Sequence, residues 1–338
     1  MSRILVIGDV HATPQELPDC EALLRLVKET IASNPVDGIV LLGDQFNTHD
    51  ILNTRCVDFW NRFLDEIAND RREVAVLVGN HDQLTPTIRG PHSMISFRDK
   101  NHVSVVDSPQ MVSFWDGDNF YDMAMMPYYA NPVEFIEEAT KLKTTYPDLD
   151  LLFCHQTFGG ADVLGFYSKD SVEPTAVPFK TIISGHIHKP MRFGKVWYPG
   201  SPRWRTLSDV DVETRAIHIV EDGVVVKSIP TNTHCTRIYK FSDSEDCPLH
   251  ICLTPDELTR ADLRITISGT ADYISKRTSE FKAKYNARCQ GVPTRSRLSK
   301  VSESEGIYPA FTRFGINFTP PNGSDKETLL RTANERLR

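Results

Sequence analysis

Two histidines near the middle of the chain, His186 and His188, stand two residues apart in the stretch SGHIHKP. They follow a short apolar run that predicts a β-strand, and side chains two residues apart in an extended chain point to the same face. Imidazole is the commonest protein ligand for transition metals, so the pair is a candidate metal site. The alternative is a loop with two solvated histidines, and the pair alone does not decide between the two.

Other short apolar runs in the first half of the chain end in residues of the same chemical kind. Each run is rich in Val, Ile or Leu and does not alternate, which is the pattern of a strand buried on both faces. Singly, an Asp or Asn after Gly is often only a turn residue. Ligands gather at the carboxyl ends of strands in such sheets, so five coincidences there favour one shared site. The residues at these five ends are Asp9 and His11; Asp44; Asn80, His81 and Asp82; His155; and His186 and His188.

Carboxylate, amide and imidazole groups in this combination suit a pair of divalent metal ions. Two such ions about 3.5–4 Å apart can activate a water molecule and bind the oxygens of a phosphoryl group. One shared carboxylate must bridge the ions, with further oxygen and nitrogen ligands on each side. The mixture favours Mn²⁺, Fe²⁺ or Zn²⁺ over Ca²⁺ and Mg²⁺, and the lack of a thiolate counts against structural zinc.

The cysteines do not point to a second metal site or to disulfides. There are seven, without a CxxC pair, which is typical of reduced thiols. Cys247, His250 and Cys252 lie too close in sequence to surround one ion, and no fourth ligand is evident.

Helical patterns separate the early apolar runs and must help to position their ends. Apolar stripes predict helices over residues 20–33 and 54–68, with Thr54 as the N-cap of the second. Asn131 and Pro132 predict the start of a third, running to about Leu142. Alternating strands and helices indicate a largely parallel sheet covered on both sides. The later strands lack intervening helices and indicate an antiparallel portion, with a second sheet packed on the first.

The last third of the chain has a different character. An exit strand, a capping box at Thr254–Glu257, a strand over residues 261–269 and a helix over 271–285 predict a small α+β module. Frequent Pro, Ser and Gly then favour a linker from 291 to 323, and a second capping box begins a final helix at Ser324.

The net charge of −7 over 338 residues argues by itself against nucleic-acid binding. The charge is uneven, however, because residues 276–300 contain eight Lys or Arg and one acid, so this segment carries +7 and the remainder −14. A phosphate backbone selects such a stripe, although a solvated helix face with a basic loop has the same composition. No run approaches the length of a membrane span and the N-terminus lacks a signal-peptide pattern, so we expect a cytoplasmic protein.

The motifs at the strand ends resemble the complete signature of the calcineurin-like metallophosphoesterases. They read DxH, GD, GNHD, a lone His and GHxH, and they span about the first two-thirds of the chain. The resemblance implies a four-layer α/β/β/α sandwich that binds two divalent ions. We expect these to be Mn²⁺, with Mg²⁺, Fe²⁺ or Zn²⁺ as alternatives. The implied roles are Asp9, His11 and His188 for the first metal; Asn80, His155 and His186 for the second; Asp44 as the bridge; and His81 beside the substrate phosphate, assisting departure of the leaving oxygen.

Two motifs differ from those of the protein serine/threonine phosphatases. They read GDQFN and VGNHDQ, so the phosphate-binding arginines of those enzymes are absent. GDxF, GNHD and the following IRGPHS are more similar to SbcD-type DNA-repair nucleases, including phage recombination endonuclease subunits. This resemblance implies a DNA exonuclease or endonuclease that forms a homodimer and works with an SbcC-type coiled-coil ATPase, in the host cytoplasm if phage-encoded.

The same resemblance divides the chain. We expect a nuclease domain at 1–232, a DNA-binding capping domain at 233–290, a linker at 291–323 and a C-terminal partner-docking helix at 324–338. The expected DNA contacts are Lys282, Lys284, Arg295 and Arg297. Two alternatives are a phosphoesterase for small nucleotides or phosphoproteins, and a non-catalytic scaffold of the same fold. The full ligand set argues against the scaffold, and the capping module with its basic stripe argues against small substrates.

Overall fold

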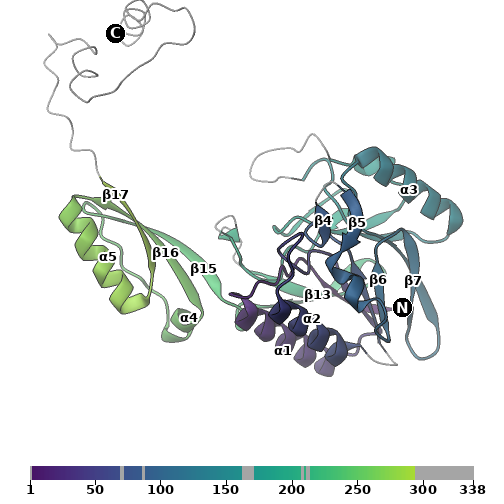
Figure 1. The fold of residues 1–338 in the computed structure, drawn as a ribbon, viewed down its shortest axis with the longest axis horizontal. Helices are drawn as coiled ribbons and strands as arrows, with labels where there is room; N and C mark the ends of the chain where they lie inside the picture. Colours follow the sequence, from purple (N-terminus) through teal and green to yellow (C-terminus); the bar gives the residue numbers. More distant parts are fainter. Residues whose placement is uncertain are drawn as a thin grey trace, which may run out of the picture.

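The computed structural model describes residues 2–68, 72–85, 88–161, 171–206, 209–210 and 214–293. Two six-stranded sheets dominate it (Figure 1). Within the described ranges, none of the helices is long and apolar enough to cross a membrane.

The first sheet has the strand order β14-β13-β1-β2-β3-β6. Its members are β1 Arg3–Ile7, β2 Gly38–Leu41, β3 Glu73–Leu77, β6 Val103–Val106, β13 Ala216–Glu221 and β14 Val224–Pro230. Strands β1, β2, β3 and β6 are parallel, and β13 and β14 close the edge beside β1 in antiparallel fashion. The carboxyl ends of the parallel strands therefore lie along one rim.

The second sheet has the order β11-β12-β10-β9-β8-β7. Its members are β7 Gln110–Trp115, β8 Phe120–Met126, β9 Leu151–His155, β10 Thr181–Gly185, β11 Met191–Phe193 and β12 Val196–Tyr198. The single parallel sheet expected for all four early apolar runs is wrong in one respect, because the run that ends in His155 is β9 of this second sheet. The β7–β8 hairpin starts the second sheet. The sequence of a buried apolar strand does not show to which of two sheets the strand belongs.

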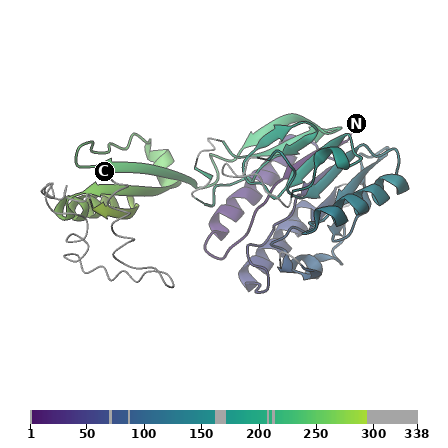
Figure 2. The same ribbon diagram turned by 90° about the horizontal axis from the view of Figure 1, so that it is seen from above.

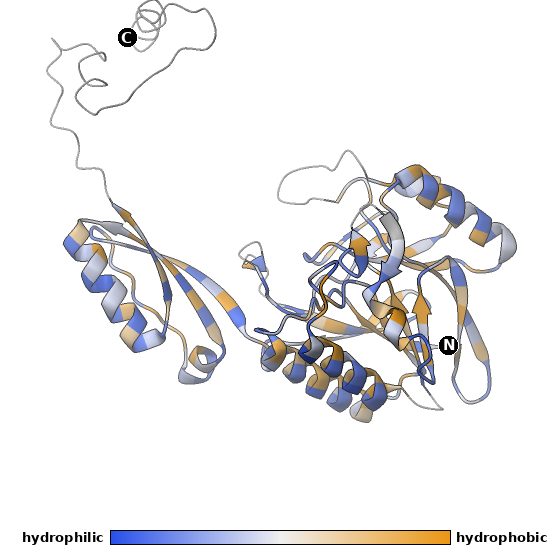
Figure 3. Ribbon diagram, viewed as in Figure 1, coloured by the Kyte–Doolittle hydropathy of each residue, from blue (hydrophilic) through white to orange (hydrophobic). Residues whose placement is uncertain are grey.

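Helices cover the outer face of each sheet, which confirms the predicted four-layer sandwich (Figures 1 and 2). Helices α1 Leu17–Ser33 and α2 Thr54–Ile67 pack on the first sheet, and α3 Pro132–Thr145 packs on the second. Along α1 and α2, hydrophobic residues alternate with hydrophilic ones, as expected for helices half buried against a sheet (Figure 3). A separate apolar core fills the space between the sheets.

The helix starts test the predicted caps. The side chain of Asn131 accepts a hydrogen bond from Val133 N at 2.9 Å, which confirms the cap of α3. The predicted Thr54 cap is wrong, because Asn53 accepts from Arg55 N at 3.0 Å and Thr54 is the first helical residue. Both residue types suit the position, so composition alone could not choose between neighbours.

Short elements complete this body of the protein. A hairpin of β4 Gln83–Thr85 and β5 Ile88–His92 leads into the 3₁₀ turn Ser93–Phe97, and a second 3₁₀ turn spans Pro174–Ala176. The hairpin follows directly after the GNHD motif at the end of β3, so it lies beside the rim that carries the candidate site.

The small α+β module is a parallel sheet of order β15-β16-β17, with α5 packed on it through Phe281 (Figure 1). Its elements are β15 Arg237–Ser244, α4 Pro255–Thr259, β16 Ala261–Gly269, α5 Ala271–Tyr285 and β17 Arg288–Pro293. The Thr254–Glu257 capping box is present. Strand β17 runs to Pro293, past the domain boundary expected at 290. The boundary was placed too early because the polar residues of this strand resemble a linker. The rest of the predicted linker and the C-terminal helix lie outside the described residues.

Candidate metal centre

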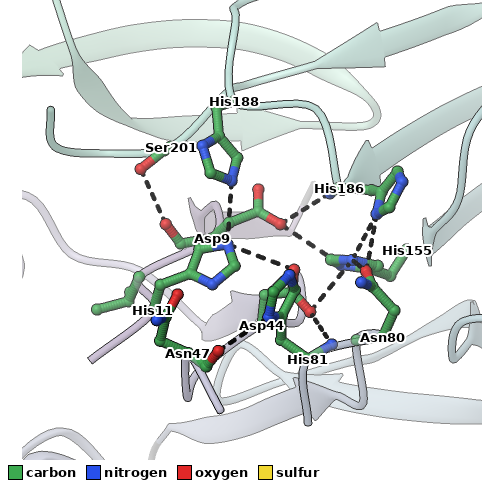
Figure 4. Close-up of polar contacts among 12 residues, drawn as sticks. Asp9, His11, Asp44, Asn47, Asn80, His81, His155, His186, His188 and Ser201 are labelled. Atoms are coloured by element: carbon green, nitrogen blue, oxygen red, sulfur yellow. Dashed lines mark hydrogen bonds and ion pairs between the residues drawn. The ribbon is translucent and has the colours of Figure 1, made fainter. Parts of the chain in front are cut away.

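The seven predicted ligands and His81 converge where the carboxyl ends of the two sheets meet (Figure 4). The first sheet contributes the residues that follow β1, β2 and β3, and the second contributes those at β9 and β10. The shared rim expected from the sequence is therefore built by two sheets and not by one.

One group of ligand atoms includes two imidazoles and a carboxylate. The Nε2 atoms of His11 and His188 lie 3.0 Å apart, and Asp44 Oδ2 lies 3.4 Å from His11 Nε2. Nearby, Asp9 Oδ1 accepts the backbone N–H of His186 at 2.8 Å, while its Oδ2 is buried without a hydrogen bond to any described residue. A buried carboxylate oxygen without a donor fits a bound cation.

A second group lies on the other side of Asp44. Asn80 Oδ1 is 3.0 Å from His155 Nε2 and 2.8 Å from His186 Nδ1, and these two nitrogens are 3.3 Å apart. Asp44 Oδ1 lies 3.4 Å from His155 Nε2. The ring of His155 is oriented by its Nδ1, which donates to the carbonyl oxygen of Leu42 at 2.7 Å and leaves Nε2 free to bind a metal.

Asp44 therefore presents one oxygen to each group, which is the geometry that a bridging carboxylate requires. The donor set of oxygens and imidazole nitrogens fits two divalent cations. Asp9, His11 and His188 would hold one ion, Asn80, His155 and His186 the other, and Asp44 both.

His81 lies at the edge of the first group. Its backbone N–H donates to Asp44 Oδ1 at 2.8 Å, and its ring Nδ1 donates to the carbonyl oxygen of Asn47 at 3.0 Å. The ring packs edge-on against His11 and stacks on His49, both with centroids 4.8 Å apart. Ligand atoms of His11, Asp44 and His81 lie within 4.8 Å of one another, so geometry alone allows His81 to be a ligand as well.

The backbone at the site is held in an uncommon conformation. His11, Asp44 and His186 have φ of +48°, +54° and +83°, in the left-handed region that such residues seldom adopt. Strain of this kind concentrates at functional sites, where the surrounding structure compensates for its cost. Glycine permits the close approach of these loops, because a Cβ on Gly79 would lie 2.2 Å from Asp44 Oδ1.

Burial and neighbouring charges set the protonation of the site. Burial lowers the pKa of His186 to about 3 and that of His11 well below its usual value, so both rings are neutral and able to bind a metal. Burial opposes ionisation of Asp44, but the adjacent His155 outweighs it and holds the pKa of this carboxyl well below its usual range.

Several supporting residues were not assigned a role from the sequence. Asp82, the last residue of GNHD, is buried and accepts backbone N–H groups of Phe46 at 3.0 Å and Gly79 at 3.0 Å, so it ties two ligand loops together. Ser201 Oγ donates to the carbonyl oxygen of Asp9 at 2.9 Å (Figure 4), and Arg215 donates to that of His188. Asp82 belongs to the GNHD motif and could have been noticed in the sequence, whereas Ser201 and Arg215 come after the last motif and carried no such signal.

The predicted DNA contacts are only partly described. Lys282 and Lys284 are exposed on the last turn of α5, and Arg295 and Arg297 lie outside the described residues. Arg277 of the basic stripe is not a free cation, because it pairs with Asp243 at 2.8 Å. Among the described residues, the groups that could hold a metal ion do not include Cys247, His250 or Cys252.

This fold, with candidate metal ligands gathered where two sheets meet, defines a metal-dependent phosphoester hydrolase. The chain belongs to the calcineurin-like phosphoesterase family, whose sequence model matches residues 2–190. Enzymes of this fold bind two divalent metals, and the structure contains two groups of side chains that could hold such ions.

Two viral proteins with provisional phosphoesterase names are similar to this chain. Protein 244L of Invertebrate iridescent virus 6 is 26% identical over 206 residues, which cover 59% of this chain and 69% of the relative. Protein 078R of Invertebrate iridescent virus 3 is 28% identical over 207 residues, covering 59% of this chain and 56% of the relative. Their names state phosphoesterase activity and no substrate.

Proposed function

We propose that this protein is a two-metal phosphodiesterase that cleaves DNA. The observation that carries the proposal is the position of Asp44, whose Oδ2 lies 3.4 Å from His11 Nε2 and whose Oδ1 lies 3.4 Å from His155 Nε2. Two divalent ions, when bound, supply an activated water and neutralise the charge on the phosphoryl oxygens. Mn²⁺ is our expected metal because of the mixed oxygen and imidazole ligands.

The residues of the chain orient the substrate and assist the leaving group. The Nδ1–H of His81 is held by the carbonyl oxygen of Asn47, so its Nε2 is the atom available to the substrate. From this position Nε2 can donate a proton to the departing sugar oxygen. His81 is therefore our candidate general acid.

The small module supports a polymeric anion as the substrate. Lys282 and Lys284 extend from α5 into solvent. On the sheet, Lys240, Arg264 and Arg288 occupy neighbouring positions across β15, β16 and β17. Asp262 offsets part of this charge, since it pairs with Arg264 at 3.0 Å and with Arg288 at 3.3 Å. Such rows of cations suit the repeated phosphates of DNA.

We further propose a homodimer that works with an SbcC-type coiled-coil ATPase. The support is the motif resemblance and the apolar stripe of the C-terminal sequence, where Leu329, Leu330, Ala333 and Leu337 recur at helical spacing. Such a helix is a common means of docking on a partner's helices.

One assay separates this function from its alternatives. The purified chain with Mn²⁺ is tested on labelled single- and double-stranded DNA, beside bis-p-nitrophenyl phosphate and p-nitrophenyl phosphate. A DNA nuclease cleaves DNA and the bis ester. Cleavage of p-nitrophenyl phosphate alone would instead support a small-substrate phosphatase, and cleavage of nothing would support a scaffold. Asp44→Asn serves as the inactive control in every arm.

A further inference from the structure

Arg205 lies beside the candidate metal centre, on the loop after β12, in no motif that the sequence singled out. Only 9% of its side chain is exposed, and its Nη2 donates to Asn47 Oδ1 at 2.7 Å. The carbonyl oxygen of the same Asn47 accepts the Nδ1–H of His81. Asn47 thus joins the Arg205 guanidinium and the candidate general acid in one hydrogen-bond network.

The positive charge of Arg205 is only partly compensated. Glu16 Oε2 lies 3.6 Å from its Nε, but the same oxygen accepts a closer hydrogen bond, at 3.1 Å, from Arg203. Asp209, also nearby, is already paired with Arg215 at 2.7 Å. Arg205 Nε is buried and makes no hydrogen bond to any described residue. A buried cation whose charge is only partly paired is costly unless another anion binds to it.

The network also brings Arg205 to the first group of ligands. Asn47, which accepts from Arg205, holds the ring of His81 as well, and this ring packs edge-on against that of His11 with centroids 4.8 Å apart. A buried guanidinium beside two bound metal ions would attract an anion strongly.

We propose that Arg205 binds a nonbridging oxygen of the substrate's phosphoryl group, on the His11 and His81 side of the centre. A guanidinium presents its N–H groups in a planar fork that matches phosphate oxygens, and it stays charged at every physiological pH. The motifs GDQFN and VGNHDQ contain no phosphate-binding arginine, and Arg205, on a loop later in the chain, would supply this cation. The inference rests on phosphoester hydrolysis at this site but does not require DNA as the substrate.

The test compares phosphate binding by Mn²⁺-loaded full-length variants. Isothermal titration with inorganic phosphate gives Kd for the wild type, Arg205→Gln, Arg205→Lys and the control Arg25→Gln, an exposed position on α1. We expect Arg205→Gln to raise Kd by about 10-fold or more, the scale of a lost charge-assisted hydrogen bond. Arg205→Lys keeps the charge without the fork and should have an intermediate effect. Arg25→Gln should match the wild type, and all should retain two Mn²⁺ by elemental analysis.

Three results would overturn the inference. One is an unchanged phosphate Kd in Arg205→Gln, or in Arg205→Lys if the glutamine variant does not fold. Another is loss of Mn²⁺ from both variants, which would assign Arg205 to holding the ligand loops. The third is a wild type that binds Mn²⁺ but no phosphate. A wild type that cleaves the bis ester and not DNA would sink only the DNA proposal, and the phosphate comparison would still decide the role of Arg205.

Discussion

The Nε2 atoms of His11 and His188 face each other at 3.0 Å, although 177 residues separate them in the chain. His11 follows β1 of the first sheet, and His188 follows β10 of the second. Two neutral imidazole nitrogens at this distance gain little from each other unless a proton or a metal ion lies between their lone pairs. The contact therefore couples metal binding to the packing of the two sheets.

Replacing Asp44 by Asn should abolish metal-dependent hydrolysis of the bis ester. An amide offers one oxygen and no charge, so it cannot serve both ligand groups or offset the repulsion between two cations. Thermal unfolding should stay cooperative because the residue lies at a strand end and not in an apolar core. The check is a Mn²⁺ titration of activity, and near-normal turnover at saturating Mn²⁺ would refute the bridging role.

Replacing His81 by Ala should separate binding from chemistry. Turnover should fall by about 10²–10⁴, the usual range for a lost acid or base, while the metal content stays near two per chain. Elemental analysis and kinetics on the same preparation decide the matter. Parallel loss of metal and activity would make His81 a ligand, a role for which it is close enough to His11 and Asp44.

Gly79→Ala should impair the centre without touching any ligand side chain. The new Cβ would lie 2.2 Å from Asp44 Oδ1 and 2.4 Å from Asp44 N, so the bridge must move. We expect weaker Mn²⁺ binding, measured by titration calorimetry. Gly90→Ala is the matched control, because nothing lies within 4 Å of its Cβ position. Equal Mn²⁺ affinity in both variants would show that the close approach of these loops is not needed.

Charge reversal of Lys282, Lys284, Arg295 and Arg297 should weaken DNA binding and flatten its dependence on salt. Each lost phosphate contact should reduce the slope of log K against log salt by slightly less than one unit. Hydrolysis of the bis ester should be unchanged, and Arg25→Glu is the control for a general effect of charge. A loss on both substrates would indicate misfolding, and an unchanged salt slope would remove these residues from the DNA surface.

The combined variant Leu330→Asp and Leu337→Asp should retain intrinsic nuclease activity and lose co-purification with an SbcC-type ATPase. The two leucines share the apolar stripe of a sequence too short to form a stable isolated helix in water. The measurement is pull-down of the ATPase beside an activity assay of the chain alone. Unfolding or loss of intrinsic activity would place the helix in this chain's own core instead.

The convergence of the candidate ligands was predictable because each follows an apolar run, and parallel strands bring their carboxyl ends to one rim. What stayed hidden depends on contacts between distant segments. The sheet to which the strand of His155 belongs is set by pairing with β8 and β10, which its own sequence does not encode. Arg205 reads as an ordinary loop residue until the fold places it against Asn47. Likewise, β17 is polar and becomes a strand only through its pairing with β16.

The limits of the family match and the limits of the folded body are different. The match ends at residue 190, by which point every candidate ligand has been supplied. Yet β13 is the strand that pairs with β1, and β12 pairs with β10. The backbones of Gly8 and Gly200 are so close that a Cβ on Gly8 would lie 2.0 Å from the carbonyl oxygen of Gly200. A fragment cut at the last ligand would thus carry every candidate metal ligand, but it would lack Arg205 and leave an unpaired strand edge in both sheets, so the matched motif region and the folding unit have separate borders in this chain.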